Sequence, residues 1–327
     1  MITVIIPTRN RAELLRNTIE SITAQIYPSS KFEVIIVNNA STDHTVGVVD
    51  SFLTRFSHIR CVYEPELGLH AGRHRGLKEA KGDVLVYVDD DIIATPSWLS
   101  AIAENFIDSK VVMVGGNNFP DFQGEVPAWL QKLWLRPSMG GQGNGWLSIL
   151  SLPEGRREFS PNYVWGCNFS IRKKVLLDAG GFHPDGMPAE LIRFRGDGES
   201  HVSGYVMKHK LKCVFDSRAS VFHAVTPERM SFDYFRQRSF NQGISDSYTR
   251  LRNQPKFGMP TSYSINIVRR LFGSIYHVIK QDQEKDSEIS ILFAIIRKSY
   301  QEGFNYHQQM YREDPEVRNW VHKLTYY

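Results

Sequence analysis

The sequence predicts an α/β fold with a mostly parallel central sheet flanked by helices and followed by a C-terminal helical extension. Short continuous apolar runs, typical of strands buried on both faces, alternate with amphipathic segments over the first hundred residues. Three of these runs end directly in a polar cluster, and from about residue 231 onward the pattern is mostly helical. Strand–helix–strand order with short links favours a sheet covered by helices, whose ligands bind beyond the carboxyl ends of the strands.

The individual elements follow from local patterns. Leu15, Ile19 and Ile22 lie on one face of a helix after the first strand. Ser41 or Thr42 is expected to cap a second helix, whose apolar face includes Val46. Further helices are expected at residues 72–80 and 174–179, and strands at residues 2–7, 32–37, 59–63, 83–88, 164–171, 213–216 and 220–223.

Composition excludes several classes of protein. Of 327 residues, 42% are hydrophobic and 23% charged, which rules out wholesale disorder, and the net charge of +4 is too small to indicate nucleic-acid binding. The three cysteines form no Cys-x-x-Cys pair, so neither a zinc ribbon nor a disulfide scaffold is expected. With no signal peptide or membrane-spanning run in view, we expect a cytoplasmic protein.

Two segments outside the strand–helix pattern offer surfaces for partners. Residues 119–161 are rich in glycine, proline and tryptophan and are expected to form a long functional loop. Trp129, Trp134 and Trp146 in it, and Trp165 after it, either stack on sugar faces or anchor local packing. An amphipathic stripe from Val268 to Ile279 either packs on the core or supports peripheral contact with the inner membrane face or a homodimer.

The strongest chemical signal is an apolar strand that runs directly into Asp89, Asp90 and Asp91. Adjacent carboxylates are costly unless a positive group lies between them, and Mg²⁺ or Mn²⁺ is bound in proteins by one or two carboxylates together with substrate phosphates. The alternative is a solvated acidic turn that caps the helix after Pro96. The position beside two other polar strand ends favours the metal site.

Seven sequence pieces occur in the order and spacing of one enzyme family: VIIPTRNRAELL, FEVIIVNNASTDHT, YEPELGLHAGRHRGLKEAKGDVLVYVDDD, WGCNFSIRKKVLLDAGGF, RGDGES, VFHAV and FRQRSFNQG. Together they cover roughly residues 1–250 and resemble a family-two glycosyltransferase with the GT-A fold. The resemblance implies a catalytic domain over residues 1–230, with a nucleotide-binding half (1–118) and an acceptor half (119–230), and a helical extension over residues 231–327.

The resemblance also implies roles in donor binding. Asn38 stands where the family usually has an Asp that recognises base and ribose, and an amide can donate as well as accept. Arg73 matches an arginine of the family, and His74 stands next to it where the family usually has Asn. The resemblance implies that Asp91, Asp89 and His223 bind the metal. The implied nucleotide contacts are Pro7, Thr8, Arg9, Asn38, Arg73, Asp89, Asp90, Arg236 and Arg238.

For catalysis, the resemblance implies that Asp197 is the general base, with Glu199 as the alternate base or an orienting group. Taken alone, Asp197 is equally well explained as the N-cap of a helix starting near Gly198. An inverting transfer needs one carboxylate to take the acceptor proton and a metal to neutralise the departing diphosphate. Trp165 is the expected acceptor contact.

The expected function is therefore metal-dependent, inverting transfer of a sugar from a nucleotide diphosphate-sugar, with UDP as the expected nucleotide, to a hydroxyl of a glycan or lipid-linked acceptor in polysaccharide biosynthesis. An inactive nucleotide-sugar or glycan-binding scaffold on the same fold is the alternative, since Asn38 departs from the family pattern. A pyrophosphorylase is disfavoured because no glycine-rich loop follows the first strand. A dinucleotide-binding dehydrogenase is disfavoured because Gly-x-Gly-x-x-Gly is absent there.

Overall fold

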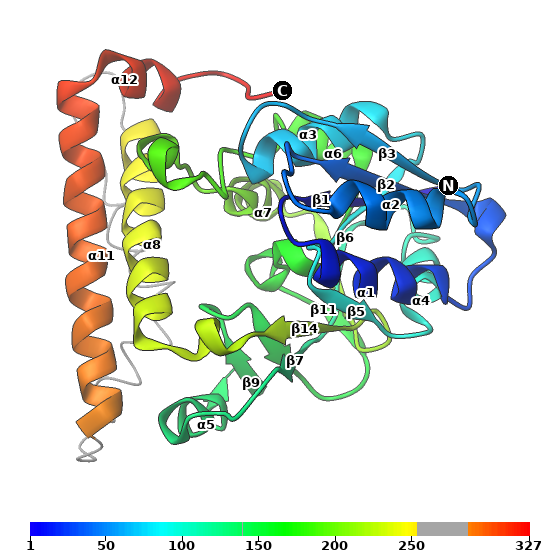
Figure 1. The fold of residues 1–327 in the computed structure, drawn as a ribbon, viewed down its shortest axis with the longest axis horizontal. Helices are drawn as coiled ribbons and strands as arrows, with labels where there is room; N and C mark the ends of the chain where they lie inside the picture. The colour runs from blue at the N-terminus through cyan, green and yellow to red at the C-terminus, as the bar shows by residue number, and fades with distance from the viewer. Residues whose placement is uncertain (139, 254–286) are drawn as a thin grey trace.

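The structure, a computed structural model, describes residues 1–138, 140–253 and 287–327 (Figure 1). Its larger sheet consists of β1 (Ile2–Thr8), β2 (Phe32–Asn38), β3 (Ile59–Tyr63), β4 (Val84–Tyr87), β6 (Val111–Gly115), β11 (Arg156–Glu158), β12 (Phe169–Arg172) and β13 (Lys212–Asp216). The strand order is β11-β13-β6-β12-β4-β1-β2-β3. Four of the seven pairings are parallel, and β12 lies antiparallel between β4 and β6. The predicted mostly parallel sheet is confirmed.

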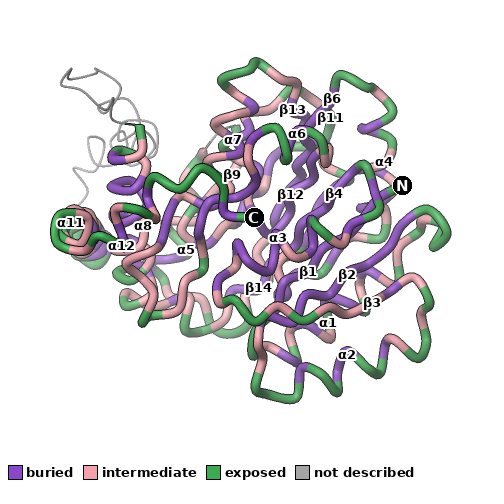
Figure 2. The backbone as a smooth tube through the Cα atoms, turned by 90° about the horizontal axis from the view of Figure 1, so that it is seen from above, coloured by how far each residue is buried: buried purple, intermediate pink, exposed green. Residues whose placement is uncertain are grey.

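Helices cover both faces of this sheet because its strands alternate their apolar side chains between two cores. Val4, Ile6 and Val34 face one core, together with α1 (Ala12–Thr23), α2 (Thr45–Leu53) and α4 (Trp98–Asn105). Ile5 and Ile35 face the other, together with α3 (Leu69–Glu79), α6 (Lys173–Asp178) and α7 (Glu199–Lys208). The central strands are accordingly the most continuously buried part of the chain (Figure 2).

Two local expectations are wrong. Neither Ser41 nor Thr42 caps α2: His44 is the N-cap, and Asp43 Oδ1 accepts from the backbone nitrogen of Thr45 at 3.0 Å. Val46, expected on the apolar face, is exposed, because Val48, Val49 and Phe52 form the buried face of α2. The strand expected from residue 164 begins only at Phe169, because Pro161–Tyr163 and Gly166–Asn168 form 3₁₀ turns before it.

A second sheet replaces the long loop expected over residues 119–161, and that expectation is corrected. Its strands are β5 (Ile92–Ala94), β7 (Asn118–Phe122), β8 (Pro137–Ser138), β9 (Gly141–Asn144), β10 (Ile149–Ser151) and β14 (Val221–Val225), in the order β5-β14-β7-β10-β9-β8. Helix α5 (Ala128–Trp134) lies in the same segment. Trp129 packs on Phe235, and Trp146 donates to Ser239 Oγ at 3.2 Å, so both are packing anchors.

The C-terminal part is helical, as α8 (Phe232–Arg252) packs along α11 (Ser287–Glu313), and α12 (Pro315–Val321) follows (Figure 1). The final residues return to α3, where Tyr326 is buried and its backbone carbonyl lies 3.1 Å from His74 Nδ1. Among the described residues, no helix combines the length and apolar character that a membrane crossing requires. The stripe from Val268 to Ile279 lies outside the described residues, and its docking role stays a prediction.

Candidate active site

The candidate site lies where β4 of the larger sheet passes into β5 of the second. Asp89, Asp90 and Asp91 occupy this passage. The antiparallel register of β14 with β5 pairs His223 with Ile92, and the backbone nitrogen of Ala224 donates to the Asp91 carbonyl at 2.9 Å. Pairing between strands about 130 residues apart therefore brings His223 to the acidic segment, as expected for a shared site.

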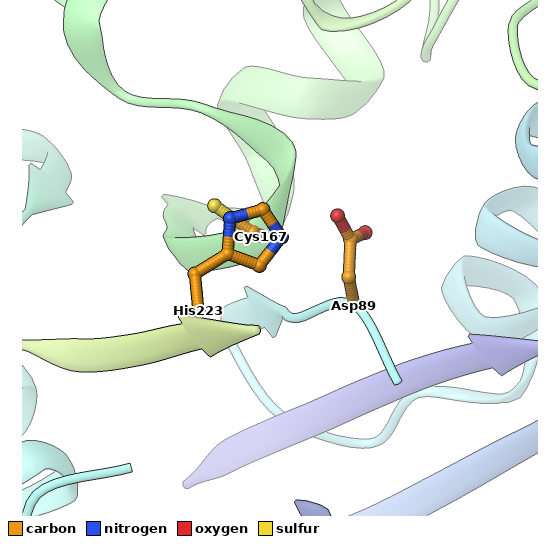
Figure 3. Close-up of side chains that lie close together, drawn as sticks. All are labelled: Asp89, Cys167 and His223. Carbon is orange, nitrogen blue, oxygen red and sulfur yellow. The ribbon is translucent and has the colours of Figure 1, made fainter. Parts of the chain in front are cut away.

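Three side chains converge on one point from different elements (Figure 3). Asp89, Cys167 and His223 each offer a ligand-type atom, and these atoms all lie within 4.8 Å of one another. Burial raises the pKa of the Cys167 thiol well above its ordinary value, and the charges of Asp89 and Asp91 raise it further. The thiol is therefore protonated, and only a thiolate would be an effective metal ligand.

Asp91 and His223 supply the better-matched pair of donor atoms. Arg229 Nη1 lies 3.3 Å from His223 Nε2. Asp91 Oδ1 lies 3.2 Å from the same nitrogen and is buried without a hydrogen-bond partner. A buried carboxylate oxygen without a partner, next to an imidazole nitrogen, supplies ligand atoms of the kind that divalent metals bind, so the residues fit a divalent metal.

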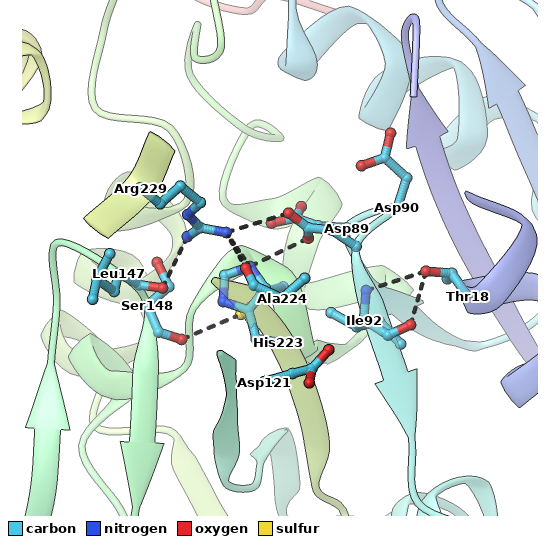
Figure 4. Close-up of polar contacts among 12 residues, drawn as sticks. Thr18, Asp89, Asp90, Ile92, Asp121, Leu147, Ser148, His223, Ala224 and Arg229 are labelled. Atoms are coloured by element: carbon cyan, nitrogen blue, oxygen red, sulfur yellow. Dashed lines mark hydrogen bonds and ion pairs between the residues drawn. The ribbon is translucent and has the colours of Figure 1, made fainter. Parts of the chain in front are cut away.

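Two arginines neutralise the buried carboxylates. Arg11 donates to Asp90 at 2.7 Å and to Asp91 Oδ2 at 2.8 Å. Arg229 donates to the same Asp91 oxygen at 3.3 Å and to the carbonyls of Ala224 and Leu147 (Figure 4). Burial disfavours the charged form of Asp91, but His223, Arg11 and Arg229 outweigh it and hold its pKa well below the usual range. Asp91 is thus anionic, with one oxygen held by arginines and the other bare.

Asp90 faces away from this pair and toward the end of β1. Thr8 Oγ1 donates to Asp90 Oδ2 at 2.7 Å, and both residues are buried. Burial raises the pKa of Asp90 to about 7, against the opposing charge of Arg11. The hydrogen bond joins the carboxyl ends of β1 and β4, which is where the sequence placed two of its polar clusters.

Arg73 connects the acidic segment to the start of α7. Its Nη1 lies 3.2 Å from Glu199 Oε2, its Nη2 lies 3.8 Å from Asp89 Oδ1, and its side chain is 2% exposed. The guanidinium also lies 5.1 Å from the Phe182 ring centroid. Gly166 donates its backbone nitrogen to Glu199 Oε1 at 3.3 Å, and a Cβ on Gly166 would clash with Arg73. The structure therefore brings Arg73, Asp89 and Glu199 together.

Asp197 occupies different surroundings. Its Oδ1 lies 2.5 Å from His183 Nδ1, and its Oδ2 accepts from Thr249 Oγ1 of α8 at 2.7 Å. The His183 ring stacks on His201 with 3.6 Å between centroids and also contacts Tyr326. Asp197 does not cap α7 through its side chain, because Gly198 is the N-cap residue and makes no side-chain hydrogen bond.

The other expected contacts are spread around this centre. Pro7 packs against Gly72 of α3, while Arg9 is exposed. Asn38 is buried, and its Oδ1 accepts from the Ser41 backbone nitrogen at 2.9 Å, so this oxygen shapes the turn after β2.

Three further expected contacts come from later parts of the chain. Arg236 is exposed and paired with Asp233. Arg238 is half-buried, and its charge helps to lower the pKa of Asp185. Trp165 is half-buried and packs against the core.

Sequence reasoning assigned no site role to Arg11, Cys167 and Arg229, which lie at the acidic segment, or to His183, which contacts Asp197. Arg11 and Cys167 lie inside quoted sequence pieces, but nothing in their spacing distinguishes them. Arg229 follows β14 in a 3₁₀ turn, Pro227–Met230. It lies six positions after His223, and a buried-strand pattern followed by a turn arginine is the only signal that could have identified it.

Comparison with known proteins identifies related glycosyltransferases. A domain relative, glycosyltransferase AglE of Haloferax volcanii, is 33% identical over 117 residues, which are 36% of this chain and 38% of AglE. The glucosyl-dolichyl phosphate glucuronosyltransferase of the same organism is 24% identical over 246 residues, 72% of each chain. The chain thus spans well under half of the first relative and most of the second.

Among solved structures, the mannosyltransferase PcManGT from Pyrobaculum calidifontis, in complex with GDP-Man and Mn²⁺, superposes with a TM-score of 0.55 at 18% identity, covering 98% of this chain and 82% of that one. This likeness establishes a shared GT-A fold. The sequence profile described as Glycosyl transferase family 2 matches residues 3–180. Because this match covers more than half of the chain, the protein belongs to glycosyl transferase family 2.

Proposed function

We propose that the protein is a metal-dependent, inverting glycosyltransferase that moves a sugar from a nucleotide diphosphate-sugar to a hydroxyl of a glycan or lipid-linked acceptor. The observation that carries this proposal is the buried Asp91 Oδ1, which has no hydrogen-bond partner and lies 3.2 Å from His223 Nε2, beside Asp89. Family membership supports the reaction class. Two named relatives or neighbours act on or bind activated sugars, as the glucuronosyltransferase and the GDP-Man complex indicate.

Asp91, His223 and Asp89 would hold the metal, which when bound would neutralise negative charge on a departing diphosphate. A mixed oxygen and imidazole set suits Mn²⁺ at least as well as Mg²⁺, which prefers oxygen ligands. Arg11 and Arg229 keep Asp91 anionic and oriented through two hydrogen bonds to its second oxygen. The two arginines therefore fix the position of the Asp91 carboxylate at the strand ends.

The remaining chemistry belongs to a carboxylate opposite the donor. Removal of the acceptor proton by such a group is worth about 10²–10⁴ in rate. Asp197 and Glu199 flank Gly198 at the start of α7 and supply two carboxylates for this role. Arg73 and the half-buried Arg238 are suited to the donor diphosphate, since guanidinium groups bind phosphates at two points.

A donor screen tests the proposal. Nucleotide release is measured with UDP-, GDP- and dTDP-sugars, each with Mn²⁺, with Mg²⁺ and with EDTA, against a panel of glycan and lipid-linked acceptors. We expect turnover with a UDP-sugar that EDTA abolishes and Mn²⁺ restores. Turnover that continues unchanged in EDTA would contradict the metal assignment.

The scaffold alternative is tested in the same experiment. A scaffold would bind UDP in a metal-dependent manner, measured by calorimetry, without release of nucleotide from any donor. The variant Asp91→Asn is the matched control, since it removes one ligand charge while preserving side-chain size. Loss of UDP binding in this variant together with turnover in the wild type supports the enzyme.

A further inference from the structure

We infer that Glu199, and not the sequence-aligned Asp197, is the carboxylate that takes the acceptor proton, while Asp197 anchors the start of α7 to the C-terminal helices. The inference rests on the proposed function and names the residue that would carry one of its steps. It depends on the opposite surroundings of two carboxylates separated by a single glycine.

Gly198 separates the two side chains. Its backbone adopts φ 54° and ψ −128°, a conformation open to glycine and strained for other residues. Asp197 comes before this bend and Glu199 begins α7 after it. A side chain on Gly198 would also meet the Asp185 carboxylate, with 2.8 Å to Oδ2. The bend sends neighbouring carboxylates of one motif into different parts of the molecule.

Glu199 lies close to the proposed metal ligands. It is 3.2 Å from Arg73, whose other nitrogen is 3.8 Å from Asp89. The Glu199 side chain is 23% exposed, against 2% for Arg73. A carboxylate that borders the cluster and still meets solvent is open to an incoming acceptor hydroxyl.

Asp197 is directed toward the opposite side. Its oxygens lie 2.5 Å from His183 Nδ1 and 2.7 Å from Thr249 Oγ1, which are shorter contacts than the 3.2 Å and 3.3 Å contacts of Glu199 with Arg73 and Gly166. The Asp197 side chain is 13% exposed, less than that of Glu199. Burial raises the pKa of Asp246 and of Tyr248, and the Asp197 charge contributes to both. These two groups belong to α8. The contacts of Asp197 therefore run through α8 and, by way of His183, to Tyr326 near the C-terminus.

With Glu199 as base, the transfer step moves one proton and one glycosyl group. The acceptor oxygen forms a bond to the anomeric carbon as its proton moves to Glu199. The bond from that carbon to the β-phosphate oxygen breaks, and its electron pair leaves with the nucleoside diphosphate. Protonated Glu199 then returns its proton to solvent. Arg73 acts as a positioning residue, because it contacts Glu199 and Asp89 at once.

Paired variants distinguish the two carboxylates. Glu199→Gln keeps the size of the side chain and removes its basicity, and Asp197→Asn does the same at the neighbouring position. Glu190→Gln, an exposed glutamate in the preceding 3₁₀ segment Ala189–Phe194, is the matched control. kcat is measured at saturating donor and acceptor, UDP affinity by calorimetry, and thermal unfolding by circular dichroism.

For Glu199→Gln we expect kcat to fall about 10²–10⁴-fold. Its UDP affinity should stay within about threefold, its Tm should fall because the buried Arg73 loses the charge of one partner, and Glu199→Asp should recover part of the rate. For Asp197→Asn we expect kcat within about tenfold of wild type and a lower Tm. If Asp197→Asn fails to fold, Thr249→Val, which removes one Asp197 contact, should lower Tm while kcat is retained.

A 100-fold or greater loss of kcat in Asp197→Asn at unchanged Tm would overturn the inference, whatever Glu199→Gln does. So would a Glu199→Gln enzyme with near-normal kcat. Failure of the proposed function looks different, because the wild-type protein would then release no nucleotide from any donor.

Discussion

Arg11 Nη1 donates to Asp90 Oδ1 at 2.7 Å, and this contact ties the residue before α1 to the acidic segment after β4. The second nitrogen of the same guanidinium reaches Asp91. One partly exposed side chain therefore neutralises two buried carboxylates that the fold forces together at the strand ends. The acidic segment is consequently ordered through its protein neighbours.

Replacing Arg11 with Ala should destabilise the protein, because two buried carboxylates lose their shared partner. We expect the free energy of unfolding to fall by about 1–3 kcal/mol, with Arg11→Lys in between since it keeps the charge but loses the two-point contact. Urea unfolding at pH 7 measures the effect. Arg16→Ala, which removes an exposed pair with Glu13, is the control and should change stability by less than about 0.5 kcal/mol. Equal losses in both variants would contradict the prediction.

Removing the imidazole of His223 should weaken metal binding. We expect His223→Ala to lower Mn²⁺ affinity in the presence of UDP by at least the roughly 10–100-fold that loss of an outer-shell partner costs. Isothermal calorimetry measures the affinity directly. His44→Ala removes an exposed histidine paired with Glu13 and should leave it unchanged. Wild-type Mn²⁺ affinity in His223→Ala would exclude His223 as a ligand.

Stability should fall as pH drops below about 6.5, in part through His74. Its Nε2 accepts from the Phe182 backbone nitrogen at 2.9 Å and its Nδ1 lies 3.1 Å from the Tyr326 carbonyl, so the folded state holds a neutral ring. Burial lowers the pKa of His74 to about 3, whereas the unfolded chain titrates at about 6.5. Between these values only the unfolded state takes up this proton. Its uptake lowers the free energy of unfolding by up to about 1.4 kcal/mol for each pH unit.

The test compares His74→Asn with wild type by urea unfolding between pH 7 and pH 5. We expect a shallower loss of stability in the variant, because one of the protonating groups is gone. Burial raises the pKa of Asp246 to about 6, which opposes the loss below pH 6, but this group is common to both proteins. Parallel pH profiles for the two proteins would argue against the assignment.

The pairing of α8 with α11 should depend on Gly243. A Cβ at this position would clash with the backbone of Tyr300 and Phe304 on α11. We expect Gly243→Ala to lower the free energy of unfolding by about 1–3 kcal/mol through overpacking. Gly204 in α7 has open space around it, so Gly204→Ala should stabilise by about 0.5–1 kcal/mol. The Tm of the two variants should therefore shift in opposite directions. A higher Tm in both variants would show that helix propensity alone decides.

Much of the first half of the fold could be predicted because its signals are local. The runs in β1 and β2 are buried along their whole length, and apolar continuity over seven residues is visible in sequence. The second sheet could not be predicted in the same way. Its strands β8, β9 and β10 have two to four residues, and β9 includes glycines, so they carry no period that distinguishes them from a loop.

The sequence by itself determined the α/β class, the strand-end acidic segment and the family, because apolar periodicity and ordered motifs are properties of neighbouring residues. Only the tertiary structure decided that β14 carries His223 to Asp91 and that Arg229 holds the two together. It also decided that Gly198 turns Asp197 toward Thr249 and Glu199 toward Arg73. The physical reason is range: these contacts join residues about 50 to 140 positions apart, and they depend on strand register and backbone direction, which spacing along the chain does not encode.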